Sequence, residues 1–140
     1  MSVDVGFPDG TVVRGSSLPD RDKDDGWREY GLYLDARWSP SWPAEVIEWE
    51  DFGLPASFDD AVQAIEHAFD LARSGKRVEV GCLGGKGRTG TVLACMAILA
   101  GVPPVDAVNW VQGNYSPKAI ENEGQERWVS RFGDQVQGRR

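Results

Sequence analysis

The chain has 140 residues and a mass of 15.4 kDa, a size that fits one compact domain and leaves no room for a second. Hydrophobic residues make up 41% and charged residues 26%, which are ordinary globular values that exclude wholesale disorder. The net charge of −7 argues against a general binder of nucleic acids or anionic membranes. Residues 1–75 are strongly acidic, whereas residues 76–140 are weakly basic, so an anion site is expected in the second half of the chain.

The first half of the chain contains strand patterns followed by one strong helix pattern. Short strands are predicted around the turn at Pro8-Asp9-Gly10, followed by a charged loop over residues 20–25. Alternation predicts a strand over residues 30–34, and a second strand is predicted over residues 44–49, after a Ser/Pro-rich break. A helix is predicted after Ser57, which can cap it, and Gly75 ends the run of apolar residues at helical spacing.

The second half begins with a short buried strand and continues as helices. The strand is predicted over residues 78–80, and a glycine-rich turn over residues 81–90 follows it. The almost wholly apolar residues 91–100 predict a buried helix, and the next helix opens at Pro103 and Pro104 and runs to about Gln112.

The last predicted helix starts near Asn122 and buries Trp128, Val129 and Phe132, and residues 133–140 are expected to fray because they have little to bury. This order predicts an α/β fold, a single domain over residues 1–140 with a central mixed or mostly parallel sheet flanked by helices.

Cysteine usage and hydropathy indicate the compartment. Cys82 and Cys95 are too few for a disulfide framework, which indicates a reducing environment. The N-terminal residues lack the basic and apolar regions of a secretory signal, and the longest apolar run is half the length needed to span a bilayer. We therefore expect a cytoplasmic protein.

The glycine-rich turn carries the chemistry. It contains four glycines among the nine residues from Cys82 to Gly90, between a strand and a helix. Glycines let successive backbone N–H groups point into one concavity, and the helix N-terminus adds free donors and the positive end of its dipole. Such a concavity suits a tetrahedral anion, two oxygens of which Arg88 can bind with its planar guanidinium.

Cys82 lies at the rim of this concavity and is the candidate nucleophile. Donors that bind phosphate also stabilise a thiolate, so Cys82 is expected to react as the anion at neutral pH. The alternative interpretation, a small buried hydrophobic residue, is preferred for Cys95. A nucleotide-binding Walker loop is excluded because Gly85-Lys86 is followed by Gly87, which has no hydroxyl to bind magnesium.

The run from Cys82 to Gly90 resembles the signature of the cysteine-dependent protein tyrosine phosphatase superfamily, and the short chain is similar to its dual-specificity branch. The resemblance implies that Cys82 is the nucleophile, that Arg88 clamps the phosphate, and that the Thr89 hydroxyl eases departure of the thiolate. It also implies a phosphate cradle made by the backbone of Leu83, Gly84, Gly85, Lys86, Gly87 and Arg88. The catalytic part would then span about residues 44–132.

A second motif matches the mobile loop that delivers the general acid in this family. Residues 49–55 contain Trp49, Asp51 and Gly53, and Asp51 lies 31 residues before Cys82. A leaving alkoxide or phenolate needs a proton as it departs, so Asp51 is the candidate acid and Glu50 the alternative. Asp59 and Asp60 are assigned to the first turn of the helix after Ser57.

A third stretch, residues 119–126, resembles the loop in which the family positions the hydrolytic water. Gln125 matches a glutamine common there, whereas the water-positioning place aligns better with Glu121, so both stay candidates. Gln125 can alternatively be half of a capping box with Asn122.

Gly81 departs from the family, which usually has a histidine there that orients the cradle, so a weaker activation of Cys82 is expected. The first function considered is a phosphatase acting on phosphotyrosyl and, more broadly, phosphoseryl or phosphothreonyl proteins or small phosphoesters. The second, suggested by Lys86, is a phosphoinositide or inositol phosphate phosphatase. The third, suggested by Gly81, is a phosphate-binding module with little turnover. We expect a monomer that binds neither nucleic acid nor membranes and uses no metal or other cofactor, since His67 is the only histidine.

Overall fold

The computed structural model describes residues 2–21 and 26–138, and its five strands form one sheet in the order β1-β2-β5-β3-β4. The strands span β1 (Ser2–Gly6), β2 (Val12–Ser17), β3 (Tyr30–Tyr33), β4 (Ala44–Val46) and β5 (Val78–Cys82). β1 and β2 form an antiparallel hairpin, whereas β2-β5, β5-β3 and β3-β4 pair in parallel. The sheet is therefore mixed and mostly parallel, as predicted, with β5 at its centre.

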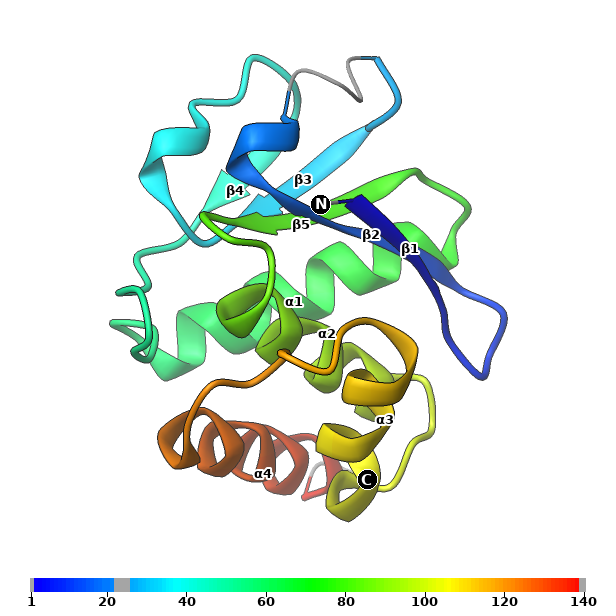
Figure 1. The fold of residues 1–140 in the computed structure, drawn as a ribbon. Coiled ribbons are helices and arrows are strands. Elements are labelled where there is room, and N and C mark those ends of the chain that lie inside the picture. Colours follow the sequence, from blue (N-terminus) through cyan, green and yellow to red (C-terminus); the bar gives the residue numbers. More distant parts are fainter. Residues whose placement is uncertain (1, 22–25, 139–140) are drawn as a thin grey trace.

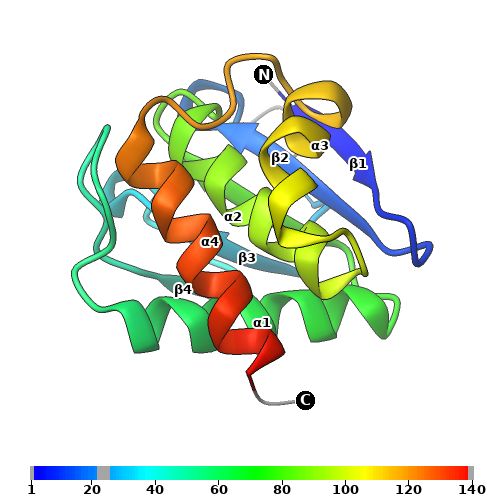
Figure 2. The ribbon, with the colours of Figure 1, turned by 90° about the horizontal axis from the view of Figure 1, so that it is seen from below.

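Four α-helices cover one face of the sheet: α1 (Phe58–Arg73), α2 (Gly87–Leu99), α3 (Ala107–Asn114) and α4 (Glu123–Gln137) (Figures 1 and 2). Helix α2 lies in their middle and is buried over all residues from Gly87 to Ile98. It contacts the other three helices as well as β5, so the helix that follows the glycine-rich turn is fixed from every side. An amphipathic pattern is absent from α2 because it has no solvent face.

The opposite face of the sheet carries the two short 3₁₀ turns η1 (Leu18–Asp20) and η2 (Ala36–Trp38) instead of an α-helix (Figure 1). Successive residues of a strand point to opposite faces. On β5 the side chains of Val78, Val80 and Cys82 join the hydrophobic core beneath the helices, so Glu79 and Gly81 point toward the η1 and η2 side.

An aromatic layer made of Tyr33, Trp38 and Trp42 packs on this second face. The rings of Tyr33 and Trp38 stack with centroids 4.3 Å apart, and the ring of Trp42 meets Tyr33 edge-on at 5.9 Å. The carboxylate of Glu79, fully buried below this layer, forms an ion pair with Arg28 at 3.0 Å and accepts the Tyr33 hydroxyl at 2.7 Å. The burial of a charge is tolerated here because the charge is paired and hydrogen-bonded.

Several predicted helix ends are confirmed by their hydrogen bonds. The hydroxyl of Ser57 accepts from the backbone N–H of Asp60, and the side chain of Asn122 accepts from the backbone N–H of Gln125. These two contacts satisfy amide groups that the helices themselves leave unpaired. Asp59 and Asp60 lie in the first turn of α1, as predicted.

Four predicted boundaries are wrong. The strand predicted over residues 44–49 ends at Val46, because the following residues form a loop in which Trp49 makes an isolated bridge with Pro55. The buried helix begins at Gly87 instead of residue 91, and a 3₁₀ turn, η3 (Pro104–Asp106), precedes α3.

The fourth boundary is the C-terminal tail predicted to fray from residue 133. Helix α4 continues to Gln137 because Gly133 and Val136 remain on its buried face, where Gly133 lies close to Pro104.

Within the described residues, none of the helices combines the length and the hydropathy that a bilayer-spanning segment requires. Of the charged loop predicted over residues 20–25, positions 22–25 lie outside the described residues.

Candidate active site

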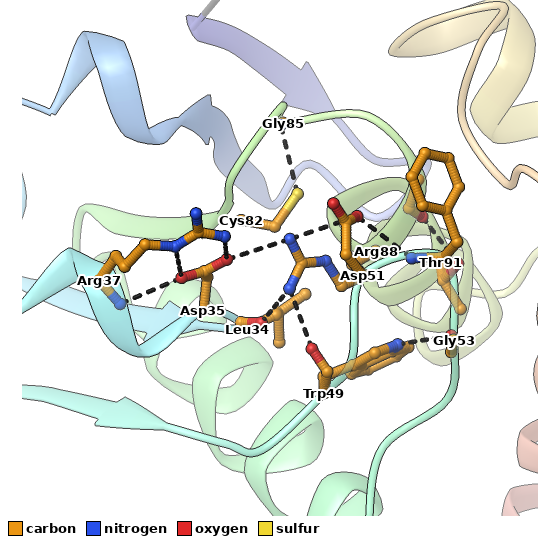
Figure 3. A network of polar contacts seen from close by, with 12 residues as sticks. Leu34, Asp35, Arg37, Trp49, Asp51, Gly53, Cys82, Gly85, Arg88 and Thr91 are labelled. Atoms are coloured by element: carbon orange, nitrogen blue, oxygen red, sulfur yellow. Dashed lines mark hydrogen bonds and ion pairs between the residues drawn. The ribbon is translucent and has the colours of Figure 1, made fainter.

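The turn between β5 and α2 forms a cradle around Cys82. The thiol is 2% exposed, and its Sγ accepts a hydrogen bond from the backbone N–H of Gly85 at 3.2 Å (Figure 3). Gly85 has φ +71°, a left-handed conformation that favours glycine, and a Cβ there would lie 2.9 Å from the backbone of Ser16. The sulfur therefore accepts a backbone donor just before the N-terminus of a 13-residue helix.

Arg88 lies in the first turn of α2, and its guanidinium is fixed by the ends of two neighbouring segments. One terminal nitrogen donates to the carbonyl groups of Leu34 and Trp49 at 2.7 and 2.9 Å, and the other donates to Asp35 at 3.2 Å (Figure 3). The residue is 3% exposed. Such a network orients the planar guanidinium before any ligand binds.

Asp35 contacts the candidate site directly and was not predicted from the sequence. Its carboxylate accepts two hydrogen bonds from the Arg37 side chain and one from Arg88, which joins the two guanidinium groups. Hydrogen bonds from Arg37, assisted by Arg88, hold the pKa of Asp35 well below its ordinary value although burial opposes them. The only signal in the sequence was its position just after a strand that proves to be parallel to β5 and adjacent to it.

Two buried polar side-chain atoms have no hydrogen-bond partner within the part of the chain that the structure describes, and both lie in the cradle. They are Nε of Arg88 and Oγ1 of Thr89. Buried polar groups are otherwise paired in nearly all cases, because an unpaired one costs about 1–3 kcal/mol. Two such atoms on adjacent residues, in the first turn of the helix that follows Cys82, are typical of a site built for a polar ligand.

Asp51 faces the cradle across a cavity of about 150 Å³. Asp51, Cys82, Lys86, Arg88 and Glu121 contribute to its walls, together with Phe52, Leu83, Gly84 and Gly87. The carboxylate of Asp51 lies 3.5 Å from the Arg88 guanidinium and is nearly half exposed. The structure thus brings Asp51 together with Cys82, Arg88 and the cradle, whereas Glu50 lines only an adjoining hollow of about 510 Å³.

The loop that carries Asp51 is fastened to α4 by two amide side chains. Asn122 donates to the carbonyl group of Phe52 at 2.8 Å, and Nε2 of Gln125 donates to that of Gly53 at 3.4 Å. The indole N–H of Trp49 donates to the same Gly53 oxygen at 2.9 Å. The oxygen of the Gln125 amide accepts a hydrogen bond from the backbone N–H of Glu121. This fully buried side chain therefore links the loop that carries Asp51 to the segment before α4.

Glu121 and Gln125 therefore have different places. Glu121 lines the cavity, and burial, with a smaller contribution from Asp51, raises its pKa. Gln125 is not among the residues that line the cavity, and both ends of its amide are engaged with backbone groups. Asn122 caps the backbone N–H of Gln125, but the predicted capping box is incomplete, because the Gln125 amide oxygen accepts from the backbone N–H of Glu121.

Other reactive side chains lie away from the cavity. Cys95 is fully buried inside α2, where burial raises the pKa of its thiol. His67 contacts the ring of Tyr30 beside a different hollow, between β4 and α1. In the described segments, no three His, Cys, Asp or Glu side chains gather as metal ligands would.

Comparisons with known proteins agree with this geometry. The family described as "Swiss Army Knife protein, DSP-PTPase phosphatase domain" (PTP-SAK) matches residues 55–128. An uncharacterized protein of Methanocaldococcus jannaschii is 34% identical over 112 residues, which cover 72% of this chain and 74% of that protein.

Solved structures share the fold at low sequence identity. The kinase associated phosphatase KAP aligns with a TM-score of 0.80 and 12% identity over 98% of this chain and 96% of that one. Human DUSP28 aligns with a TM-score of 0.73 and 12% identity over 99% and 100% of the two chains. PTPMT1, solved in complex with PI(5)P, aligns with a TM-score of 0.74 and 14% identity over 91% and 93%.

The fold and the Cys-x5-Arg cradle define the class of cysteine-based phosphatases of the dual-specificity type. Within it, the chain belongs to the PTP-SAK family of DSP-PTPase phosphatase domains.

Because the pKa of Asp35 is lowered, the free energy of unfolding depends on pH in the acid range. Because the folded-state pKa of Asp35 is lowered, its contribution to stability is present above the unfolded value near pH 4 and is lost as the pH falls below it. We expect Asp35→Asn to lower the free energy of unfolding at pH 7 by about 1–3 kcal/mol and the difference from the unmodified chain to shrink toward pH 3. Urea unfolding at pH 7, 5 and 3, followed by tryptophan fluorescence, measures it. The exposed Asp134, changed to Asn, is the control, and a difference that is constant with pH contradicts the assignment.

Proposed function

We propose that the chain is a phosphatase that hydrolyses phosphotyrosine, and more broadly phosphoserine and phosphothreonine, in proteins through a phosphocysteine intermediate. The observation that carries this proposal is the shared cavity. Cys82, the Arg88 guanidinium and the Asp51 carboxylate face one space of about 150 Å³, and within the described residues the buried Nε of Arg88 has no hydrogen-bond partner. A nucleophile, an anion clamp and an acid are the three groups that phosphoryl transfer through cysteine needs.

In the first step the Cys82 thiolate attacks phosphorus, an S–P bond forms and the P–O bond to the leaving group breaks. The backbone amides of residues 83–88 and Arg88, the Nε of which is unpaired in the described chain, bind the equatorial oxygens where charge develops. Asp51 donates its proton to the departing oxygen, which leaves as an alcohol or phenol.

In the second step water replaces the thiolate. Asp51, now a carboxylate, accepts a proton from the water as its oxygen attacks phosphorus, and the S–P bond breaks to give inorganic phosphate. Glu121, at the cavity wall, is better placed than Gln125 to orient this water, while Gln125 holds the acid loop. The Thr89 hydroxyl, which has no hydrogen-bond partner among the described residues, is proposed to donate to the leaving thiolate.

The covalent step is tested by Cys82→Ser. We expect hydrolysis of p-nitrophenyl phosphate in EDTA to fall by at least about 10³-fold, because an alcohol lacks the thiolate's nucleophilicity. Acid-quenched mass spectrometry of the unmodified chain with substrate should show a phosphorylated peptide containing Cys82. The control is Cys95→Ala, which changes a cysteine inside the core and should keep its activity. Unchanged turnover by the serine variant would refute the mechanism.

The acid is tested by Asp51→Asn. We expect kcat to fall by about 10²–10⁴-fold for a phosphotyrosyl peptide and by a smaller factor for p-nitrophenyl phosphate, the leaving group of which needs less protonation. Affinity for vanadate should change little, since Asp51 is not part of the cradle. The matched control is Glu50→Gln, which removes the neighbouring carboxylate outside the cavity. If Glu50→Gln shows the larger loss, Glu50 is the acid.

A phosphoinositide or inositol phosphate is the second candidate substrate, because the Lys86 side chain adds a positive charge to the cavity wall. PTPMT1, a structural relative, was solved with PI(5)P. The net charge of −7 counts against work at an anionic membrane.

The variant Lys86→Ala separates the two substrate classes. For the protein phosphatase we expect the same small loss of kcat/KM, about 2–5-fold, on a phosphotyrosyl peptide and on inositol polyphosphates, since one partly exposed cation contributes little. The control is Lys118→Ala, an exposed lysine away from the cavity. A loss confined to the inositol phosphates would instead favour the second candidate.

A further inference from the structure

Trp38 lies against the nucleophile although 44 positions separate the two residues in sequence. It ends η2, is fully buried, and its indole N–H donates to the carbonyl oxygen of Cys82 at 3.1 Å. This is an ordinary length for an N–H···O hydrogen bond. The contact holds the first peptide group of the cradle from the side of the sheet opposite to the helices.

The indole also fills the space that a side chain at position 81 would occupy. A Cβ on Gly81 would lie only 2.7 Å from Cε2 of Trp38, closer than side chains approach one another. Glycine at position 81 and tryptophan at position 38 therefore belong to one arrangement. Gly81 has no side chain that could donate a hydrogen bond to the cradle. The cradle still has a side-chain donor, because Trp38 of η2 supplies one.

The position of Trp38 is fixed by the aromatic layer. Its ring stacks on Tyr33, the hydroxyl of which accepts from the indole of Trp42 at 2.9 Å and donates to Glu79. Burial, and then the charge of Glu79, raise the pKa of Tyr33, so the phenol remains a donor at neutral pH. The buried ion pair of Glu79 with Arg28 anchors this chain of contacts in the sheet.

Peptide geometry connects this contact to the ligand. A trans peptide group is planar, so its C=O and N–H bonds point in opposite directions. Because Trp38 holds the oxygen of Cys82 on one side, the N–H of Leu83 is directed to the other side, into the turn that lines the cavity. Tyr115 acts similarly further along the turn, where its hydroxyl donates to the carbonyl oxygen of Gly85.

We propose that Trp38 is a positioning residue for the reaction at Cys82, in which its indole N–H fixes the peptide group that starts the phosphate cradle. The proposal rests on the proposed phosphatase function and assigns to η2 the orientation of the cradle that position 81 does not supply. The ligand whose affinity is expected to depend on Trp38 is a tetrahedral oxyanion bound by the backbone amides.

The test compares Trp38→Phe with Trp42→Phe. Both variants lose one indole donor of the same aromatic layer, fully buried at Trp38 and partly buried at Trp42, and keep an aromatic ring, but of the two only Trp38 contacts the cradle. We expect Trp38→Phe to weaken tungstate binding, measured by calorimetry, by about 5–10-fold, which is the effect of one oriented hydrogen bond. It should also lower kcat for p-nitrophenyl phosphate and slow the alkylation of Cys82 by iodoacetamide at pH 7. Trp42→Phe should stay within twofold in all three measurements.

The outcomes separate the two proposals. If the unmodified chain neither hydrolyses phosphoesters nor binds tungstate, the proposed function and the role of Trp38 fail together. If it does both and folded Trp38→Phe, verified by near-UV circular dichroism, equals Trp42→Phe in affinity and alkylation, the role of Trp38 alone is overturned.

A measurement on the unmodified chain covers the case in which Trp38→Phe does not fold. Hydrogen bonds in one chain polarise each other, so tungstate binding at the Leu83 amide should shift the indole ¹H and ¹⁵N signals of Trp38 while those of Trp110, on α3, remain in place. The Trp38 indole proton should also resist exchange with solvent. A Trp38 signal that tungstate leaves unmoved overturns the proposal.

Discussion

The direction of the peptide groups between β5 and α2 is the constraint on which the site depends. A carbonyl group turned toward the cavity would repel both a thiolate and a phosphate, so each carbonyl group of the turn needs a donor elsewhere. Those of Cys82 and Gly85 accept from Trp38 and Tyr115, two buried aromatic donors. Burial, with a smaller contribution from Cys82, raises the pKa of Tyr115, which keeps that phenol protonated beside an anionic site. The cradle is thus oriented by contacts made outside it.

The two faces of the sheet divide the work. The helix face is apolar and fixes the position of α2, and with it Arg88 and the end of the helix dipole. The other face holds the buried Glu79–Arg28 pair and the aromatic layer, which extends to the nucleophile through Trp38. Directional polar contacts on that face can specify an orientation that apolar packing alone would leave loose. β5 serves both faces because its residues alternate between them.

The sequence was informative where the signal is local. The cap at Ser57, the strand before Cys82 and the glycine-rich turn are each defined by a few neighbouring residues, and all of them exist in the structure. Asp35 and Trp38 were missed because their roles depend on strand order, which places the end of β3 beside β5. Trp38 lies within a segment that reads as irregular chain. Gly81 carried a signal, since a glycine where a side chain is usual leaves a space that another residue must fill, but nothing in the sequence shows which one.

The position of the loop that carries Asp51 depends on residues much later in the chain. Asp51 reaches the cavity only if the loop from Trp49 to Gly53 lies against α4, and the carbonyl groups of Phe52 and Gly53 are held there by Asn122 and Gln125. Gln125 gives both ends of its amide to backbone groups, and such a side chain is poorly suited to exchange partners with water in every catalytic cycle. Glu121, at the cavity wall with a raised pKa, retains that freedom. In the proposed mechanism, orientation of water and placement of the acid are therefore divided between two residues four positions apart, and the resemblance to the family alone could not choose between them.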